Sequence, residues 1–336
     1  MSFRCISKYR GVLMGLSILS ILIFHYTEDC VNAGYNLIGP VVDFKNYVGS
    51  CGVDIFLFLS GLGLYYSFKK NSDIKQFYQK RLTRILIPYF MVAIPAWLIY
   101  DLLYLNVGIV QMFKDIFFIS FFTDKVIWFW YILLMAICYI AYPFMFDFID
   151  KEDNDKTKML QVFAAITLVA LLLATYNPTF FNKIEIALTR FPAFFAGSLI
   201  GKASYNDKKI SYGTITILFL SLLLINLRLT SKSILFRYIV AIYAIAFIIL
   251  VAIALDLLAK KGIKCTILKK IIEWFGNYSL ELYLTHVAIR RIMNRYNYPT
   301  YRIRYYVIMI VLSVLLSLII KKLTTIITAP KKNKAN

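Results

Sequence analysis

His25 and His286 are the only two histidines of this 336-residue chain, and histidine is the side chain best suited to carry a proton near neutral pH. Each lies in a long apolar run, and Asp54 lies near the start of another. A carboxylate can orient and charge a histidine that acts as an acid or a base. The plain alternative is that each histidine only hydrogen-bonds a neighbouring helix. Two histidines at matched depth favour chemistry, although their spacing does not say which reaction they perform.

Few other ionisable residues interrupt the apolar runs. A charged side chain in the middle of a membrane costs about 2.5–3.5 kcal/mol on insertion scales, so such a residue usually has a function or a partner. With the topology given below, Arg190 lies near the outer start of one run, and Glu281 lies about one and a half helical turns deeper than His286. The ionisable residues of this class, besides the histidines, are Asp54, Asp101, Arg190, Asp256 and Glu281.

A second candidate site is basic. Arg81 and Arg84 precede an apolar run in the segment Lys80-Arg81-Leu82-Thr83-Arg84, and a spacing of three places them on one face of a helix. Arginine pairs bind phosphate through bidentate hydrogen bonds, so this face suits the phosphates of a cytosolic cofactor. The alternative is that both residues only anchor the end of a membrane span.

The elements that must position these residues are membrane helices. Sixty per cent of the residues are hydrophobic and the mean hydropathy is +0.69, so the core of the protein lies in lipid. Backbone groups in lipid must be satisfied within a segment, which predicts an all-α polytopic bundle in residues 1–336 without a soluble domain. The ten predicted spans are 11–26, 52–68, 85–106, 126–149, 159–176, 187–201, 212–228, 236–258, 274–292 and 303–328. The span 187–201 is short for a full crossing and contains Pro192, so we expect it to be kinked or shielded by neighbouring helices.

The distribution of basic residues predicts the orientation. With the N-terminus inside, the inner segments hold 25 Lys and Arg residues and the outer loops hold 12. The positive-inside rule then places both termini in the cytoplasm, with the first ten or so residues leading into a retained span rather than a cleaved signal peptide. The loop before the last span departs from the rule, because Arg290 and its basic neighbours lie outside. We expect it either to meet an anionic polymer or headgroup or to anchor the interface.

Two other functions have little support. The net charge of +20 comes from basic residues beside apolar spans, without the exposed aromatic residues of nucleic-acid sites, so we expect no nucleic-acid partner. The five cysteines show no CxxC spacing, so we expect no metal site. Cys30 and Cys51 share one predicted loop, where they either form a disulfide or remain thiols.

These segments together resemble the acyltransferase 3 family, whose members modify cell-surface sugars. The resemblance covers nearly the whole chain. The first span, which ends at His25, is similar to the family's first helix, and the segment from Gly52 to Gly61 is close to its second-helix signature. Further segments similar to the family's landmarks are Phe77, Arg81-Leu82-Thr83-Arg84-Ile85, Pro88-Tyr89, Trp128, Tyr131, Arg190–Phe194, Gly197 and Tyr278–His286.

The resemblance implies a reaction. Family members take an acyl group, usually acetyl from acetyl-CoA, and place it on a cell-surface sugar. Carried over, His25 is catalytic with Asp54 and His286 beside it, and Arg81 and Arg84 bind the coenzyme A thioester from inside. Many members carry an arginine where this chain has Met14, and we expect Arg10, one turn earlier, to replace it.

The predicted partners follow from the same resemblance. We expect the acceptor to be a cell-surface glycan or a lipid-linked sugar, with Arg190, Trp128 and Glu281 lining its site, and the surrounding partner to be the bilayer of the cell membrane. Two alternatives remain. The buried charges of a polysaccharide or small-molecule exporter would line a path, and a non-catalytic partner in a polysaccharide synthesis complex would tolerate loss of both histidines.

Overall fold

The computed structural model describes residues 2–35, 51–151, 154–226, 234–263 and 266–329. These residues form helices and no strand, with one isolated β-bridge between Ser2 and Lys209, so the predicted all-α membrane bundle is confirmed. The first half of the chain forms α1 (Arg4–Lys8), α2 (Arg10–Asn32), α4 (Gly52–Lys70), α5 (Ile74–Trp97), the π-helix η2 (Leu98–Leu105), α6 (Ile109–Ile116), α7 (Ile119–Thr123) and α8 (Trp130–Asp150). The second half forms α9 (Asp155–Tyr176), α10 (Pro178–Leu188), α11 (Phe191–Tyr205), α12 (Tyr212–Asn226), α13 (Ile234–Lys260), α14 (Thr266–Asn277), α15 (Ser279–Arg295) and α16 (Ile303–Thr328).

Seven of the ten predicted spans coincide with helices that are long and apolar enough to cross a membrane. Among the described residues the other three, 52–68, 212–228 and 274–292, do not meet that standard. Helix α4 has 19 residues and both a carboxylate and a lysine pair, and α12 has only a short apolar stretch. The helices that do meet it are Arg10–Asn32, Ile74–Leu105, Trp130–Asp150, Asp155–Tyr176, Pro178–Tyr205, Phe236–Lys260 and Ile303–Thr328.

The predicted span 274–292 is not one helix. The helix is interrupted at Tyr278, between α14 and α15. The residues just before the break are Gly276 and Asn277, both poor helix formers. Helix α14 then packs along α2, and a Cβ on Gly276 would lie 1.9 Å from Gly11 O. The close approach of two backbones therefore separates a short helix beside α2 from the helix that carries His286.

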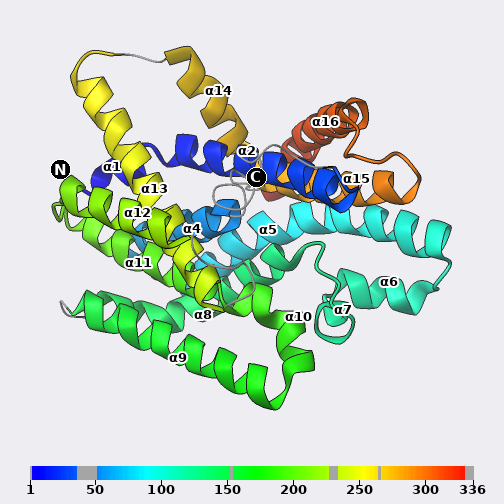
Figure 1. Ribbon diagram of the computed structural model, residues 1–336, viewed down its shortest axis with the longest axis horizontal. Coiled ribbons are helices and arrows are strands. Elements are labelled where there is room, and N and C mark those ends of the chain that lie inside the picture. Colours follow the sequence, from blue (N-terminus) through cyan, green and yellow to red (C-terminus); the bar gives the residue numbers. More distant parts are fainter. Residues whose placement is uncertain (1, 36–50, 152–153, 227–233, 264–265, 330–336) are drawn as a thin grey trace, which may run out of the picture.

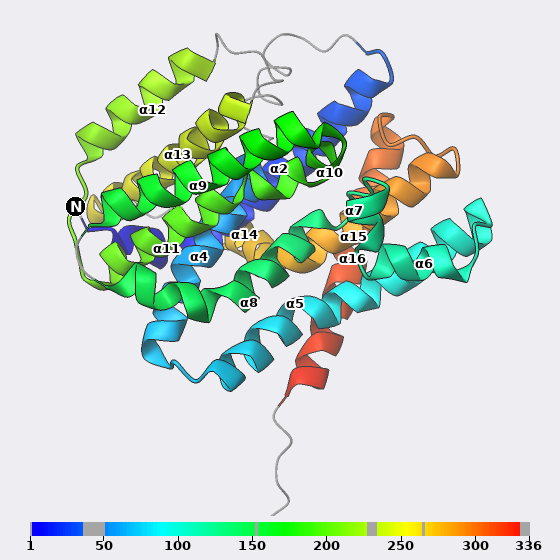
Figure 2. The ribbon, with the colours of Figure 1, turned by 90° about the horizontal axis from the view of Figure 1, so that it is seen from below.

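Prolines and a π-helix shape two of the other predicted spans. Pro192 lies in the first turn of α11, where its missing N–H costs no hydrogen bond, so the predicted irregularity is a break between α10 and α11. Pro88 and Pro95 lie inside α5, and η2 begins three residues after Pro95. Figure 2 shows η2, α6 and α7 gathered at one end of the bundle, away from the N-terminal end of α5. The helices α6 and α7 lie in a segment that was predicted to be mostly a loop.

The centre of the bundle is the crossing of α4 and α11 (Figure 1). The two helices approach so closely that a Cβ on Gly197 would lie 1.9 Å from Phe58 O, and one on Gly61 would lie 2.1 Å from Phe194 O. Helix α9 lies at the edge of the bundle and only 6% of its apolar window is buried, as expected for a surface that faces lipid. Small residues thus hold the middle together while apolar side chains face outward.

The cysteine pair predicted as one alternative is not formed. Cys30 and Cys51 are both buried, and their thiols donate to different backbone carbonyls, Tyr301 O at 3.7 Å and Val240 O at 3.8 Å. The other alternative, separate thiols, is confirmed.

Candidate functional site

The structure brings the two histidines together from opposite ends of the chain. His25 lies in the last third of α2 and His286 in the middle of α15, and their ring centroids are 5.2 Å apart. His286 is fully buried, whereas the side chain of His25 keeps 20% of its exposure. The two histidines, which the sequence placed at the same depth, are therefore in direct contact range of each other.

The proton positions of His286 follow from its partners. Its Nδ1 lies 2.7 Å from Leu282 O, one turn earlier in α15. A carbonyl oxygen only accepts, so Nδ1 carries the hydrogen and Nε2 carries a lone pair. Nε2 is buried and has no hydrogen-bond partner within the described part of the chain. A buried acceptor without a partner is costly, so this nitrogen is an unsatisfied polar atom enclosed beside His25.

Arg290 holds the other histidine. Its guanidinium lies 2.7 Å from His25 Nδ1, 2.7 Å from a Glu28 carboxylate oxygen and 2.5 Å from an Asp29 oxygen. Asp29 also accepts a hydrogen bond from the hydroxyl of Thr300. Two carboxylates thus balance one buried arginine beside the histidine pair, in a charge-assisted network.

The imidazole of His25 can carry its hydrogen on either nitrogen within this network. A guanidinium only donates, so while Arg290 bonds Nδ1 the hydrogen of the imidazole is on Nε2. Glu28 lies 3.3 Å from the same Nδ1 and can instead accept from it. In that second arrangement Nε2 carries the lone pair and His25 can act as a base. Glu28 is therefore the carboxylate that can orient His25.

Asp54 has a different neighbour. Its carboxylate lies 3.4 Å from Arg190 Nε, and Arg190 also lies over the ring of Trp130, 5.2 Å from the centroid. Asp54 is 2% exposed and begins α4, so a buried ion pair joins α4 to the start of α11. Asp54 thus faces Arg190 across the helix interface, whereas Glu28 lies beside His25.

A cavity of about 170 Å³ lies beside His25 and Arg190, whereas His286 and Asp54 do not line it. Its lining also includes Trp128, Arg290 and Tyr283. The Tyr283 hydroxyl donates to Trp128 O at 3.4 Å, which joins α15 to the segment before α8. Three of the residues predicted from sequence, His25, Arg190 and Trp128, therefore share one cavity, here called the histidine cavity.

Arg10, Arg81 and Arg84 line a second cavity of about 80 Å³ at the other end of α2, here called the arginine cavity. Arg10 donates from Nε to Leu59 O at 3.1 Å, and a Cβ on Gly63 would meet its guanidinium at 2.8 Å. Gly63 therefore provides the room that Arg10 occupies.

The charges of the arginine cavity are not compensated. Within the described residues no carboxylate lies at salt-bridge distance from Arg10, Arg81 or Arg84, and Arg81 Nε has no hydrogen-bond partner. Three guanidinium groups that face one cavity without a counter-ion fit the phosphates of an anionic ligand. Met14 lines the same cavity, so Arg10 reaches the place from one turn earlier.

Glu281 lies away from the histidines. It is 2% exposed and pairs with Lys321 of α16 at 3.1 Å. Both line a larger cavity of about 870 Å³ between α5, α15 and α16, to which Arg84 also contributes. The structure therefore associates Glu281 with the arginine end of the bundle.

The cavities form a series. Arg84 lines both the large cavity and the arginine cavity, and Tyr283 lines both the arginine cavity and the histidine cavity. Arg10 and His25 are 15 residues apart in α2, which corresponds to roughly 22 Å along the helix. A ligand held by its anionic end at Arg10 therefore needs an extended arm to reach the histidines past Tyr283.

Comparison with known proteins identifies the family of the chain. The family model described as "Acyltransferase domain", Acyl_transf_3, matches residues 12–322. The chain belongs to the acyltransferase 3 family. The protein is thus a multi-pass membrane acyltransferase, as the sequence motifs indicated. Searches among curated proteins and solved structures returned no match.

The main residues that the sequence analysis of this acyltransferase missed are Glu28, Asp29 and Arg290. Glu28 and Asp29 follow His25 at spacings of three and four, and Arg290 follows His286 at a spacing of four, so each shares a helix face with a histidine. Arg290 was predicted to belong to a basic outer loop, whereas it is 4% exposed and inside α15. The spacing of three or four residues from each histidine could have identified them, but Arg290 was interpreted as a charge of the outer loop.

Proposed function

We propose that this acyltransferase moves an acyl group, most simply acetyl, from a coenzyme A thioester at the arginine cavity to a sugar hydroxyl at the histidine cavity. The observation that carries the proposal is the pair of neighbouring cavities, one lined by three uncompensated arginines and the other by His25, that share Tyr283 in their walls. The anionic end of the donor and the acceptor hydroxyl then meet the protein at opposite ends of α2.

The residues have separate roles in the proposed reaction. Arg10, Arg81 and Arg84 hold the donor phosphates, and the acyl end reaches the histidine cavity past Tyr283. His25, with Nδ1–H donating to Glu28, takes the hydroxyl proton at Nε2 as the oxygen attacks the thioester carbonyl. The new C–O bond forms, the C–S bond breaks, and the leaving thiolate takes up a proton. His286 does not line the cavity and packs against the ring of His25, so its role is to position His25.

The orientation of the protein in the membrane determines which partners it can meet on each side. We take both termini as cytoplasmic, which puts the arginine cavity on the side where the donor is made and the histidine cavity on the outer side of the cell membrane. The acceptor is then an extracytoplasmic glycan or a lipid-linked sugar. The inner segments hold 25 of the basic residues and the outer ones 12, which supports this orientation.

Substitution of His25 by Gln tests the reaction. An amide can form hydrogen bonds but cannot take up a proton at neutral pH, so His25→Gln is expected to lower transfer by about 10²–10⁴ while leaving coenzyme A affinity unchanged. The measurement is transfer of label from acetyl-CoA to cell-surface glycan at matched membrane abundance, with His286→Gln assayed beside it. Near-normal transfer by His25→Gln together with loss in His286→Gln would move the base to His286, and normal transfer by both would refute the proposed chemistry.

A further inference from the structure

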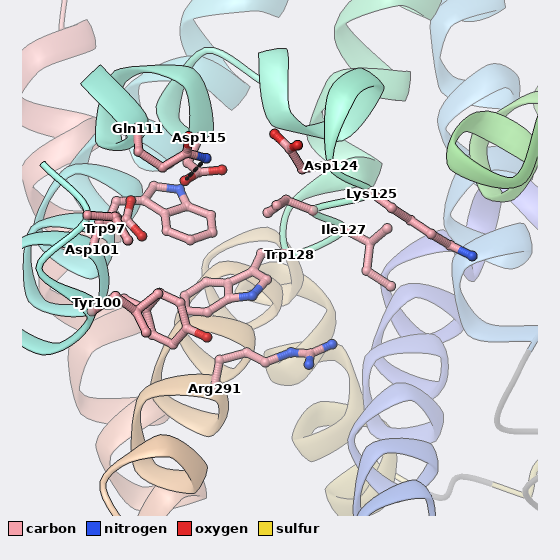
Figure 3. A pocket seen from close by; sticks show the side chains of 13 residues that line it. Trp97, Tyr100, Asp101, Gln111, Asp115, Asp124, Lys125, Ile127, Trp128 and Arg291 are labelled. Atoms are coloured by element: carbon pink, nitrogen blue, oxygen red, sulfur yellow. Dashed lines mark hydrogen bonds between the residues drawn. The ribbon is translucent and has the colours of Figure 1, made fainter. Parts of the chain in front are cut away.

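A fourth cavity shares Trp128 with the histidine cavity. We propose that it is the subsite for a neutral, hydroxyl-rich sugar ring of the acceptor, an inference that rests on the proposed function. Its volume of about 550 Å³ falls within the roughly 300–1,000 Å³ that is usual for small-molecule sites. Figure 3 shows its walls, which come from α5, η2, α6 and the segment before α8, with Arg291 of α15 on one side. We call it the glycan cavity.

Aromatic rings form one wall of the glycan cavity. Trp97 and Trp128 stack with centroids 4.2 Å apart, and Tyr100 meets Trp128 edge-on at 4.7 Å. Trp97 is 2% exposed, and Tyr100 is partly exposed. Such rings bury large apolar area in a fixed geometry, and their faces and edges suit the C–H faces of a sugar ring. Figure 3 shows the ring of Tyr100 beside that of Trp128, next to Arg291.

Buried polar atoms without partners face the same cavity. Within the described residues, Trp97 Nε1 has no hydrogen-bond partner, and Asp101 Oδ2 and Asp115 Oδ1 accept from no donor group. Asp101 is 2% exposed and Asp115 is 6% exposed, and their carboxyl groups are close enough to share one proton. Gln111 donates to the other Asp115 oxygen at 3.2 Å and to Ser120 at 3.1 Å, which fixes that carboxylate (Figure 3). A buried polar atom is costly unless a ligand or water satisfies it.

The kinds of atom match the hydroxyl groups of a sugar. Asp101 and Asp115 offer acceptors and the Trp97 indole offers a donor, whereas a hydroxyl group is both. The cavity has three carboxyl groups, of which Asp101 and Asp115 share a proton, so with Asp124 they carry about two negative charges against the two cations Lys125 and Arg291. This balance differs from the purely cationic arginine cavity. A neutral polyol therefore fits the glycan cavity better than a phosphate or another anion.

The backbone around the glycan cavity is unusual. Tyr100 and Asp101 both reach it from η2, and π-helical turns are frequent at functional sites. Three of the described non-glycine residues with positive φ lie in the same region: Asn106 at 57°, Phe118 at 61° and Lys125 at 60°. Such conformations cost about 1–3 kcal/mol each unless the surroundings enforce them, and they cluster at ligand sites.

The glycan cavity borders the histidine cavity. Their linings share Ile127, Trp128 and Arg291. A ring stacked beside Tyr100 therefore lies one tryptophan away from the cavity that His25 lines. In an acceptor that occupies both, one sugar binds at Trp97 and Tyr100 while a hydroxyl of its neighbour reaches His25.

Acceptor kinetics test this subsite. The variants are Tyr100→Ala and Asp101→Asn, and the matched controls are Tyr176→Ala and Asp147→Asn, whose side chains are exposed and outside the cavities. The probe is surface polysaccharide extracted from cells that carry the gene, assayed with labelled acetyl-CoA. We expect each cavity variant to raise the acceptor KM by about tenfold or more, because a hydrogen bond to a charged group or a stacked ring is lost. The KM for acetyl-CoA is expected to stay at the wild-type value, which also reports that the variant is folded.

The outcomes separate the subsite from the function. If the wild type transfers label and both cavity variants keep the acceptor KM within about twofold of wild type, the subsite is refuted while the function stands. If the wild type transfers no label, the proposed function fails, and tryptophan fluorescence titration with the same polysaccharide decides the subsite alone. Saturable quenching that is lost in Tyr100→Ala supports the subsite, and equal quenching in wild type and variant, or none in either, overturns it.

Discussion

Replacement of Glu28 by Gln separates the orientation of His25 from the stability of the network around Arg290. Glu28 lies 3.3 Å from His25 Nδ1 and 2.7 Å from Arg290 Nη2. The same carboxylate oxygen, Glu28 Oε2, makes both contacts. Glutamine has the same shape, and its amide oxygen can occupy that place and keep the hydrogen bond from Arg290, but it carries no negative charge to favour the arrangement in which His25 Nδ1 donates to it. His25 Nδ1 then stays the acceptor of Arg290, the imidazole hydrogen is held on Nε2, and the nitrogen that should take the hydroxyl proton is no longer a base.

The size of the two effects follows from burial. Loss of a correctly oriented base is expected to lower kcat by about 10²–10⁴. The Glu28 side chain is 33% exposed, so the lost charge pair is expected to cost only about 0–1 kcal/mol of stability. Asp29 contrasts with it, since its side chain is 9% exposed and it binds both Arg290 and Thr300. Asp29→Asn is expected to cost about 3–5 kcal/mol, because it breaks a buried ion pair.

The assay combines transfer kinetics with unfolding of the detergent-solubilised protein. Glu185→Gln is the matched control, because Glu185 pairs with Arg237 at 2.9 Å and is 27% exposed but lies outside the histidine cavity. We expect Glu28→Gln to lose transfer with a melting temperature close to that of Glu185→Gln. A kcat within about threefold of wild type would refute the reasoning, because Glu28 would then serve only as a partner of Arg290.

Three further predictions concern the donor site, the helix crossing and the orientation. Arg81→Ala and Arg84→Ala are expected to weaken coenzyme A binding by about 1.5–3 kcal/mol, and lysine is expected to restore it only in part; unchanged affinity in a binding titration would make the pair a membrane anchor. Gly197→Ala is expected to destabilise the protein by about 1–3 kcal/mol or more in thermal unfolding, because the added Cβ would meet Phe58 O. Gly213→Ala is the control, since a Cβ there would lie in open space. Equal melting temperatures for the two variants would contradict the close crossing of α4 and α11. In a cysteine-free background of intact cells, an impermeant thiol reagent is expected to label a cysteine at position 35 and not one at position 329, and the reverse pattern would invert the orientation.

The sequence by itself determined the class of the protein and the depth of its candidate residues. Apolar runs in lipid must be helical, because no water can satisfy the backbone, so an all-α bundle followed from composition and length. Arg81 and Arg84 share a helix face by their spacing alone. His25 and His286 could be assigned the same depth because each holds a fixed position along a run. Position along a helix is local information, which a sequence carries directly.

Only the tertiary structure decided which side chains meet across helices. Asp54 begins a helix at the right depth to reach His25, yet it pairs with Arg190, and Glu28 takes the place beside the histidine. The reason is rotation about the helix axis, which depends on how neighbouring helices pack and which the order of residues along one helix does not fix.

The same reason applies to the remaining differences. Glu281 was predicted near the histidines but pairs with Lys321, because α15 turns that face toward α16. Arg290 was predicted to be a loop charge but lies against Asp29, because α15 continues to Arg295 and packs on α2, so Arg290 lies one turn after His286 inside a helix. Trp128 was found from sequence, whereas its neighbours Trp97 and Tyr100 join it only where the π-helix at the end of α5 folds against the start of α8. The depth of a residue in the membrane could therefore be predicted from the sequence, whereas contacts between helices were determined by how the helices pack.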